Sequence, residues 1–189
     1  MMSTGLVRCF IAFDINDETV LKRLVEIQRM LEETGADLKL VEPKNIHVTL
    51  RFLGEVQPAM AESISKEMDG VSFSPFDVEL NGAGVFPNMR RINVVWVGIR
   101  KGVVELEKIF EQLDVGLARL GFKQDRRGFS PHITIARVRT AKNKEMLAHR
   151  IIELRDYEFG VIRADMLKLM RSVLKPEGPI YTALHEVRK

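Results

Sequence analysis

The sequence predicts an α+β fold: two pseudo-symmetric lobes of antiparallel sheet, with helices outside and a central cleft between them. Two observations predict it. A His-x-Thr pattern occurs at His47 and again at His132, each time within an apolar run that is typical of a strand. The order strand, helix, strand, helix, hairpin also occurs twice. We therefore expect residues 1–189 to form a single bilobal domain with an internal duplication, roughly 10–100 and 101–189.

The first helix of each half is indicated by apolar residues at helical spacing. Residues 16–35 carry this pattern after an N-cap at Asn16 or Asp17, and residues 101–121 carry it again. Both ranges end in a glycine, which is typical of a helix C-terminus. A second helix is expected after the first His-x-Thr strand, beginning near Pro58.

The counterpart of this second helix is expected to begin near Asn143. Each half then closes with a strand-turn-strand segment, over residues 76–99 and 164–187. Because the same elements recur in the same order, pseudo-twofold symmetry would bring the two His-x-Thr strands to equivalent positions. The sheets are expected to be largely antiparallel, each covered on one side by helices.

Strand geometry predicts what the two motifs present to the cleft. Alternate side chains of a strand lie on opposite faces, so His47, Thr49 and Arg51 share one face, and His132 and Thr134 share the matching one. The apolar residues between them need a core and are expected to face the helices. They are Ile46, Val48, Leu50, Phe52, Ile133 and Ile135.

Charge is distributed unevenly along the chain. Residues 1–89 carry 8 basic and 14 acidic side chains, whereas residues 90–189 carry 21 basic and 12 acidic side chains. The densest basic stretch brackets His132 and comprises Arg119, Lys123, Arg126, Arg127, Arg137, Arg139, Lys142 and Lys144. This stretch is either a solvated basic face or a footprint for phosphate.

The composition excludes several classes of protein. With 46% hydrophobic and 29% charged residues, the chain is typical of a soluble globular protein. Its apolar runs are far shorter than the roughly 20 residues that cross a bilayer, and its N-terminus lacks the layout of a signal peptide. Cys9 is the single cysteine, so no internal disulfide can form. We expect a cytoplasmic protein with no membrane association and no obligate protein partner.

Two histidines and two threonines on opposed strands suit acid-base chemistry on a phosphodiester. One imidazole can take a proton from the attacking oxygen while the other gives a proton to the leaving oxygen. The two hydroxyls suit the non-bridging phosphate oxygens. A catalytic zinc site usually has three protein ligands and this constellation stops at two, so we expect no metal and no other cofactor. A Ser-His-Asp triad is unsupported because the sequence has no nucleophile-elbow pattern.

Several motifs resemble those of the two-histidine phosphoesterases, in particular the RNA 2′,3′-cyclic phosphodiesterases once called 2′-5′ RNA ligases. These motifs are "RCFIAFDI", "HVTL", "FLGEV", "GVFPNMRR", "VVWVGI" and "FSPHITIAR", and they cover essentially the whole chain in order. The resemblance implies metal-independent opening of a 2′,3′-cyclic phosphate to a 2′-phosphate. It also implies that the partners are RNA ends, tRNA-derived ends included, or small cyclic nucleotides.

Carried to this chain, the resemblance puts His47 and His132 in the acid and base roles, and Thr49 and Thr134 on phosphate. Sequence charge favours His47 as the proton donor and His132 as the proton acceptor. Positive neighbours of His132 disfavour its protonated form, whereas His47 lies in the acidic half of the chain.

Further substrate contacts are expected at five residues: Arg51, Phe129, Arg126, Arg127 and Arg137. Arg51 follows its motif on the cleft face, whereas the matching position of the second motif is Ala136. Arg137 should point away from the cleft unless its strand is bulged. Phe129 suits either stacking on a nucleobase or a place in the core.

Three functions are compatible with this sequence. The first is hydrolysis of RNA or nucleotide 2′,3′-cyclic phosphodiesters. The second is the same chemistry in reverse, in which a ribose 5′-hydroxyl replaces water and RNA ends are joined by a 2′-5′ linkage. The third is an RNA- or nucleotide-binding module without turnover, which the intact His and Thr of both motifs disfavour.

Overall fold

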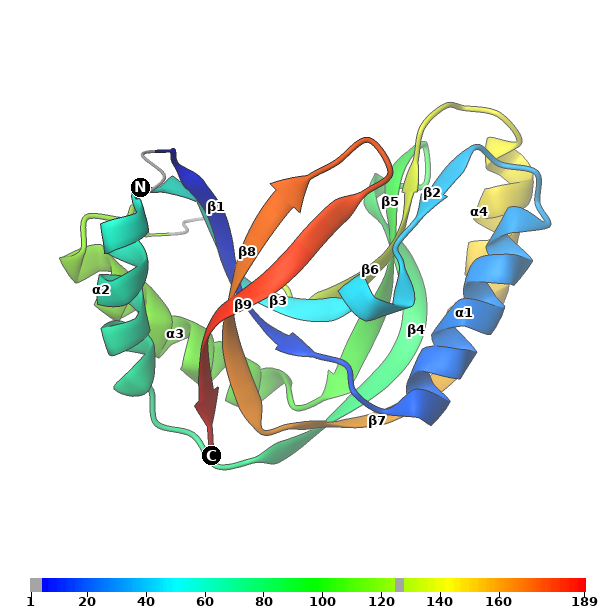
Figure 1. Ribbon diagram of the computed structural model, residues 1–189. Coiled ribbons are helices and arrows are strands. Elements are labelled where there is room, and N and C mark those ends of the chain that lie inside the picture. The colour runs from blue at the N-terminus through cyan, green and yellow to red at the C-terminus, as the bar shows by residue number, and fades with distance from the viewer. Residues whose placement is uncertain (1–4, 125–127) are drawn as a thin grey trace.

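The computed structural model describes residues 5–124 and 128–189. These residues form two antiparallel sheets and four α-helices (Figure 1). The strands are β1 Val7–Asp14, β2 Leu38–Leu40, β3 His47–Val56, β4 Phe76–Asn88, β5 Arg91–Lys101, β6 His132–Val138, β7 Glu158–Ala164, β8 Met166–Leu174 and β9 Pro179–Arg188. The helices are α1 Glu18–Glu32, α2 Pro58–Asp69, α3 Val103–Arg119 and α4 Lys144–Glu153, with a 3₁₀ turn, η1, at Pro43–Asn45. The predicted α+β class is confirmed.

The two sheets do not correspond to the two halves of the sequence. One sheet has the order β3-β1-β8-β9, so two strands of the first half pair with two of the second. The other has the order β2-β6-β5-β4-β7, in which β6 of the second half lies between β2 and β5 of the first. Each sheet therefore needs both halves of the chain. Strands β2 and β7 were not expected from the sequence pattern.

The helices lie in two pairs on opposite sides of the molecule, with the strands between them (Figure 1). Helices α2 and α3 pack together and contact β9 and β3 of the four-stranded sheet. Helices α1 and α4 contact β6, β7 and β4 of the five-stranded sheet. One face of each sheet is thus covered by helices. We call the opposite side of each sheet its inner face.

The predicted helix signals correspond to real caps. The Asp17 carboxylate accepts a hydrogen bond from the backbone N–H of Val20 at 2.8 Å, which satisfies one of the free donors at the start of α1. Beyond the ends of α1 and α3, Gly35 and Gly121 adopt φ of 68° and 88°, a conformation that glycine tolerates best. Among the described residues, no helix combines the length and the apolar character needed to cross a membrane.

The main core lies between the sheets and their helices, and a small second cluster lies on the inner face. In the main core Ile11, Leu24 and Leu106 are completely buried. The inner cluster contains Phe10, Ala12 and Met170, with Tyr181 packed against it. Because β1 alternates, Ile11 and Ala12 are both buried but on opposite faces of one strand. The inner face therefore has an apolar floor beside the first His-x-Thr motif.

Candidate active site

The two His-x-Thr motifs lie next to each other although they belong to different sheets. His47 begins β3 and His132 begins β6, and these two strands are neighbours across the junction of the sheets. The rings are near enough for the charge of His132 to act on His47. The sequence-predicted pair is thus brought together by the fold.

Both imidazoles are held by the same kind of hydrogen bond. His47 Nδ1 lies 2.6 Å from the carbonyl oxygen of Asn45, and His132 Nδ1 lies 2.7 Å from that of Ser130. A carbonyl oxygen only accepts, so Nδ1 must be the donor in both rings. This fixes the tautomer and leaves each Nε2 available, as a proton acceptor when the ring is neutral and a donor when it is charged.

Aromatic side chains surround each histidine. The His47 ring stacks on Phe10, with a centroid distance of 4.8 Å, and meets Tyr181 edge-on at 5.5 Å. The His132 ring meets Phe86 edge-on at 4.9 Å, and Trp96 lies 6.3 Å away. These ring contacts limit the rotation of each imidazole, in addition to the Nδ1 hydrogen bond.

Sequence reasoning missed these aromatic neighbours as part of the site. In the sequence, Phe86 and Trp96 lie in apolar runs that are typical of packing residues, and nothing marks Phe10 or Tyr181. They come from β1, β4, β5 and β9, whereas the histidines lie on β3 and β6. Only the strand order and register, which bring Phe10 opposite Phe52 in β3, would have revealed them.

His47 lies in a setting that disfavours its charged form. Burial lowers the pKa of His47, and the hydrogen bond to Asn45 and the negative charge of Asp14 oppose this effect. Asp14 is the register partner of His47 on β1, and its carboxylate lies 2.7 Å from Lys168 Nζ. Lys168 also lies 3.1 Å from Glu186. Beside His47 the Lys168 ammonium is therefore shared by two carboxylates.

Thr49 and Thr134 occupy matching positions in the two sheets. Thr49 pairs in register with Ala12 of the inner apolar cluster, and Thr134 pairs with Trp96. Paired residues of neighbouring strands share a face, so each hydroxyl lies on the inner face together with its histidine. Both threonines are partly exposed.

A β-bulge directly after each motif changes the predicted alternation. In the β1–β3 ladder, Ala12 pairs with Thr49 but Ile11 pairs with Arg51, so Leu50 is the extra residue. In the β5–β6 ladder, Trp96 pairs with Thr134 but Val95 pairs with Ala136. The extra residue there is Ile135. Both bulges thus fall three residues after the histidine.

The expectation that Arg51 shares the face of His47 is wrong because of the bulge. Arg51 turns to the helix side, where it is only 8% exposed. Its guanidinium lies 3.1 Å from the Asp114 carboxylate of α3 and donates to the backbone carbonyl of Lys123. Phe52 takes the place on the inner face and lies beside Phe10, with a centroid distance of 6.2 Å.

The second bulge has the opposite consequence for Arg137. Arg137 pairs with Val94, which pairs with Phe86, and Phe86 contacts the His132 ring. Arg137 therefore lies on the inner face. Its charge opposes the effect of burial, which raises the pKa of Tyr181 on the facing sheet. The conditional expectation for Arg137 is thus met: the strand is bulged. Ala136, the position that matches Arg51, is buried on the helix side.

The other predicted substrate contacts are less well supported by position. Phe129 is partly buried and stacks on Phe110 of α3 with a centroid distance of 4.8 Å, so one face of its ring is occupied. Arg126 and Arg127 lie outside the described residues.

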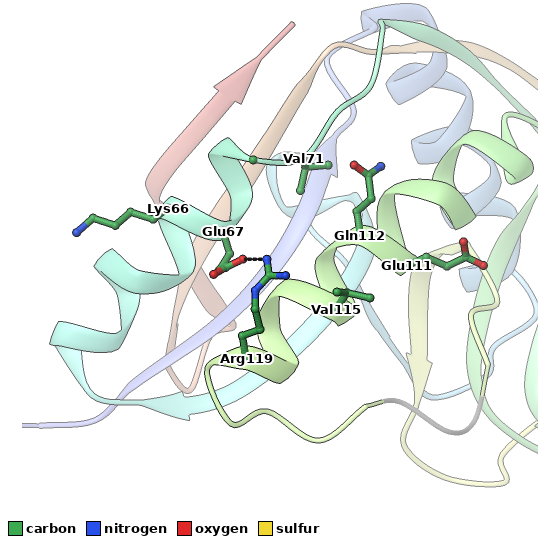
Figure 2. A pocket seen from close by; sticks show the side chains of 8 residues that line it. Lys66, Glu67, Val71, Glu111, Gln112, Val115 and Arg119 are labelled. Carbon is green, nitrogen blue, oxygen red and sulfur yellow. Dashed lines mark hydrogen bonds and ion pairs between the residues drawn. The ribbon is translucent and has the colours of Figure 1, made fainter.

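A hollow of the described surface lies apart from the two histidines. It has a volume of about 580 Å³ and lies between α2 and α3, on the helix side of the four-stranded sheet (Figure 2). Glu67 and Arg119 form an ion pair of 2.6 Å there, marked in Figure 2, and Lys66 and Glu111 also line the hollow. Its lining mixes both charges and contains no residue of either His-x-Thr motif. Within the described ranges, no group of three His, Cys, Asp or Glu side chains is arranged to hold a metal ion.

Comparison with known proteins identifies the class to which this fold and site belong. The chain belongs to the family described as LigT like Phosphoesterase, whose model matches twice, over residues 15–96 and 97–181. Among similar proteins are the RNA 2′,3′-cyclic phosphodiesterases of Methanocaldococcus jannaschii and Aeropyrum pernix. The first is 38% identical over 95% of this chain and 99% of its own length. The second is 37% identical over 88% of this chain and 94% of its own.

Solved structures show the same fold. The protein TT0787 of Thermus thermophilus superposes with a TM-score of 0.77 at 27% identity, covering 96% of this chain and 97% of that one. The apo form of Escherichia coli LigT superposes with a TM-score of 0.78 at 24% identity, covering 97% and 98%. The chain is therefore a phosphoesterase of the LigT-like family in both sequence and fold.

Proposed function

We propose that this protein opens 2′,3′-cyclic phosphodiesters at RNA ends to 2′-phosphomonoesters, with His47 as general acid and His132 as general base. The observation that carries the proposal is the pair of imidazoles on neighbouring strands, each with Nδ1 held by a carbonyl and Nε2 available. Relatives named RNA 2′,3′-cyclic phosphodiesterase cover nearly the whole chain, which supports the same reaction class.

The reaction needs one proton taken and one proton given. His132 Nε2 accepts a proton from water as the water oxygen bonds to phosphorus. The bond between phosphorus and the ribose O3′ breaks, and His47 Nε2–H donates its proton to that oxygen. The products are a 2′-phosphate and a free 3′-hydroxyl. A second turnover requires a proton to pass from His132 back to His47 through solvent.

The threonine hydroxyls would stabilise the negative charge on the phosphate oxygens. Thr49 and Thr134 lie on the inner face beside their histidines and donate to the two non-bridging oxygens, where negative charge is concentrated in the transition state. Arg137, on the same inner face of β6 as Thr134, adds a positive charge to this face.

Binding of the substrate would reverse the protonation preference of His47. In the free protein, burial lowers the pKa of this ring and favours its neutral form. A phosphodiester anion between the two rings acts in the opposite direction, because a nearby negative charge favours imidazolium. Asp14 contributes in the same sense. His47 would therefore hold its proton most firmly when the substrate is present.

Phe52 is a better candidate for stacking on a base than Phe129. Its side chain is 65% exposed on the inner face, beside the Phe10 ring that stacks on His47. Aromatic rings stack on bases with little sequence preference, which suits an enzyme that acts on ends of varied sequence. We include Phe52 in the proposed substrate site in addition to the residues predicted from sequence.

Two alternatives use the same site. In the joining reaction, a 5′-hydroxyl of RNA replaces water and forms a 2′-5′ linkage, and His132 would deprotonate that hydroxyl. In the non-catalytic alternative, the site only binds RNA. The Nδ1 hydrogen bond that both imidazoles share favours turnover, because a binding module has no need to fix the same tautomer twice.

Incubation with 2′,3′-cyclic AMP in the presence of EDTA tests the proposal. We expect adenosine 2′-phosphate as the product, at a rate that chelation leaves unchanged, and no turnover by a His47→Ala, His132→Ala double variant. Activity that vanished in EDTA and returned with zinc or manganese would contradict the mechanism. Addition of RNA with a 5′-hydroxyl separates hydrolysis from joining, since only joining consumes that RNA.

A further inference from the structure

The inner face of the five-stranded sheet carries cations beyond the two motifs. Lys39 of β2 is the register partner of Arg137, so the two side chains share the inner face. Its neighbours Leu38 and Leu40 pack against the main core, which places Lys39 on the opposite side from them. The sequence did not mark Lys39, because β2 has only three residues.

A third cation continues this face toward the β4–β5 turn. Arg91 pairs with Asn88, and the next pair, Ile92 with Pro87, has Ile92 in the core. Alternation therefore turns Arg91 to the inner face. The Asn88 side-chain oxygen accepts hydrogen bonds from the backbone N–H groups of Arg90 and Arg91, at 3.0 and 3.1 Å, and these bonds stabilise the turn. Lys144 Nζ donates to the Arg90 carbonyl at 3.0 Å and ties the turn to α4.

These cations have no carboxylate partner within the described part of the chain. Lys39, Arg91 and Arg137 form no ion pair there, whereas nearby Arg139 lies 4.0 Å from Asp37. On the inner face beside His47, by contrast, Lys168 is shared by two carboxylates. A polyanion that leaves the reaction centre over the His132 side is thus attracted by three cations.

The spacing of the cations matches a chain of phosphates better than a single phosphate. Lys39 and Arg137 stand on neighbouring strands, about 5 Å apart at the backbone. Arg91 lies two register steps beyond Val94, the register partner of Arg137, which corresponds to roughly 7 Å along the strand. A mononucleotide whose phosphate lies between the histidines does not extend to Arg91, whereas an oligonucleotide does.

We propose that Lys39 and Arg91 bind backbone phosphates of the nucleotides that precede the cyclic end, so that the protein prefers RNA chains to cyclic mononucleotides. This proposal rests on the proposed function and adds the path of the RNA: from the two histidines, past Arg137 and Lys39, to the β4–β5 turn.

The test compares two substrates in a Lys39→Gln, Arg91→Gln double variant. We expect kcat/KM on a short oligoribonucleotide with a 2′,3′-cyclic end to fall roughly tenfold more than kcat/KM on 2′,3′-cyclic AMP, because only the chain reaches both cations. The slope of log kcat/KM against log salt for the oligonucleotide should become shallower by about 1.4, or about 0.7 for each of the two cations removed from a single strand. Lys22→Gln is the matched control, because Lys22 is exposed on α1 and faces away from this path.

A binding assay keeps this proposal separate from the proposed function. The probe is a labelled oligoribonucleotide that already ends in a 2′-phosphate, so no turnover is needed, and the double variant should bind it more weakly with a shallower salt slope. Equal losses on the two substrates, unchanged binding of the probe, or an equal loss in Lys22→Gln would overturn the proposed path. If the wild-type protein hydrolysed neither substrate, the proposed function would fail while the binding assay still decided the path.

Discussion

His47 and His132 occupy matching positions but have different surroundings. Both rings donate from Nδ1 to the carbonyl two residues earlier, and both strands bulge three residues later. Around His47, Phe10 and Tyr181 exclude water, and Lys168 is shared by two carboxylates. The sheet that carries His132 has Lys39 and Arg137 on its inner face. The repeated motif thus sets the tautomer, and its surroundings provide the means to distinguish an acid from a base.

The largest effect is expected from removing one histidine at a time. His47→Ala and His132→Ala should each lower kcat roughly 100- to 10,000-fold on a cyclic nucleotide, as loss of an acid or a base does. A phosphodiester with a nitrophenolate leaving group separates the roles, because that group needs little help from an acid. His47→Ala should recover much of its rate on this substrate, and His132→Ala should not. The reverse pattern would exchange the two assignments.

The threonines should show the next largest effect. Thr49→Ala and Thr134→Ala should slow turnover roughly 10- to 1,000-fold, since each removes a donor to the phosphate oxygens. Thr→Ser keeps the hydroxyl and should cost much less. Equal losses of turnover at the two positions would mean that the two threonines contribute equally to catalysis, as their matching positions suggest. Wild-type rates in both alanine variants would mean that the threonines are strand-forming residues with no role in catalysis.

The two bulges predict opposite behaviour for Arg51 and Arg137. Arg137→Gln should lower kcat/KM roughly 10- to 100-fold, the equivalent of one charge-assisted hydrogen bond, and leave the melting temperature unchanged. Arg51→Met should leave Asp114 buried without its partner and cost roughly 3–5 kcal/mol of stability. A double variant that also carries Asp114→Leu should regain much of that loss. Normal stability in Arg51→Met would contradict the buried pair.

The smallest effects concern pH. If His47 is the acid, kcat/KM falls as pH rises through the pKa of its ring in the free protein, and burial moves that fall below the ordinary imidazole value. Asp14→Asn removes a charge that raises the pKa, so the fall should move to lower pH. Tyr181→Ala admits water beside the ring and should move it to higher pH. Profiles of kcat/KM against pH measure both shifts, and shifts in the same direction would contradict this account of His47.

Local patterns were sufficient to predict the four helices and the strands other than β2 and β7. Helical spacing and caps located α1 to α4, because an amphipathic helix reports its buried face in its own sequence. The short edge strand β2 has too few residues for a periodic signal, and its place beside β6 depends on contacts with a distant segment. The predicted internal duplication stays a prediction, supported by the two family-model matches.

The bulge in β3 explains why the expectation for Arg51 is wrong although His47 and Thr49 share a face as expected. Side chains alternate strictly from His47 to Thr49. Because Leu50 is an extra residue, Phe52 and not Arg51 lies on the inner face. A bulge is a property of two paired strands, so a single strand's sequence does not report it. The charge argument for His47 was limited in the same way. Its acidic sequence neighbours matter less than burial by Phe10 and Tyr181, which come from other strands.

Both sheets contain strands from both halves of the chain, and this arrangement allows one repeated motif to supply two histidines with different surroundings. A chain of half this length would leave β1 and β5 without neighbours from the other half, and it would complete its sheets only by exchanging strands with a second copy. Such an assembly has one histidine from each copy at a shared site, and identical copies must give both rings the same surroundings. Joining the halves into one chain removes that constraint. Each half is then free to acquire its own substitutions, so the sheet of one ring can carry a row of cations while the other ring lies beside a paired ammonium and carboxylates.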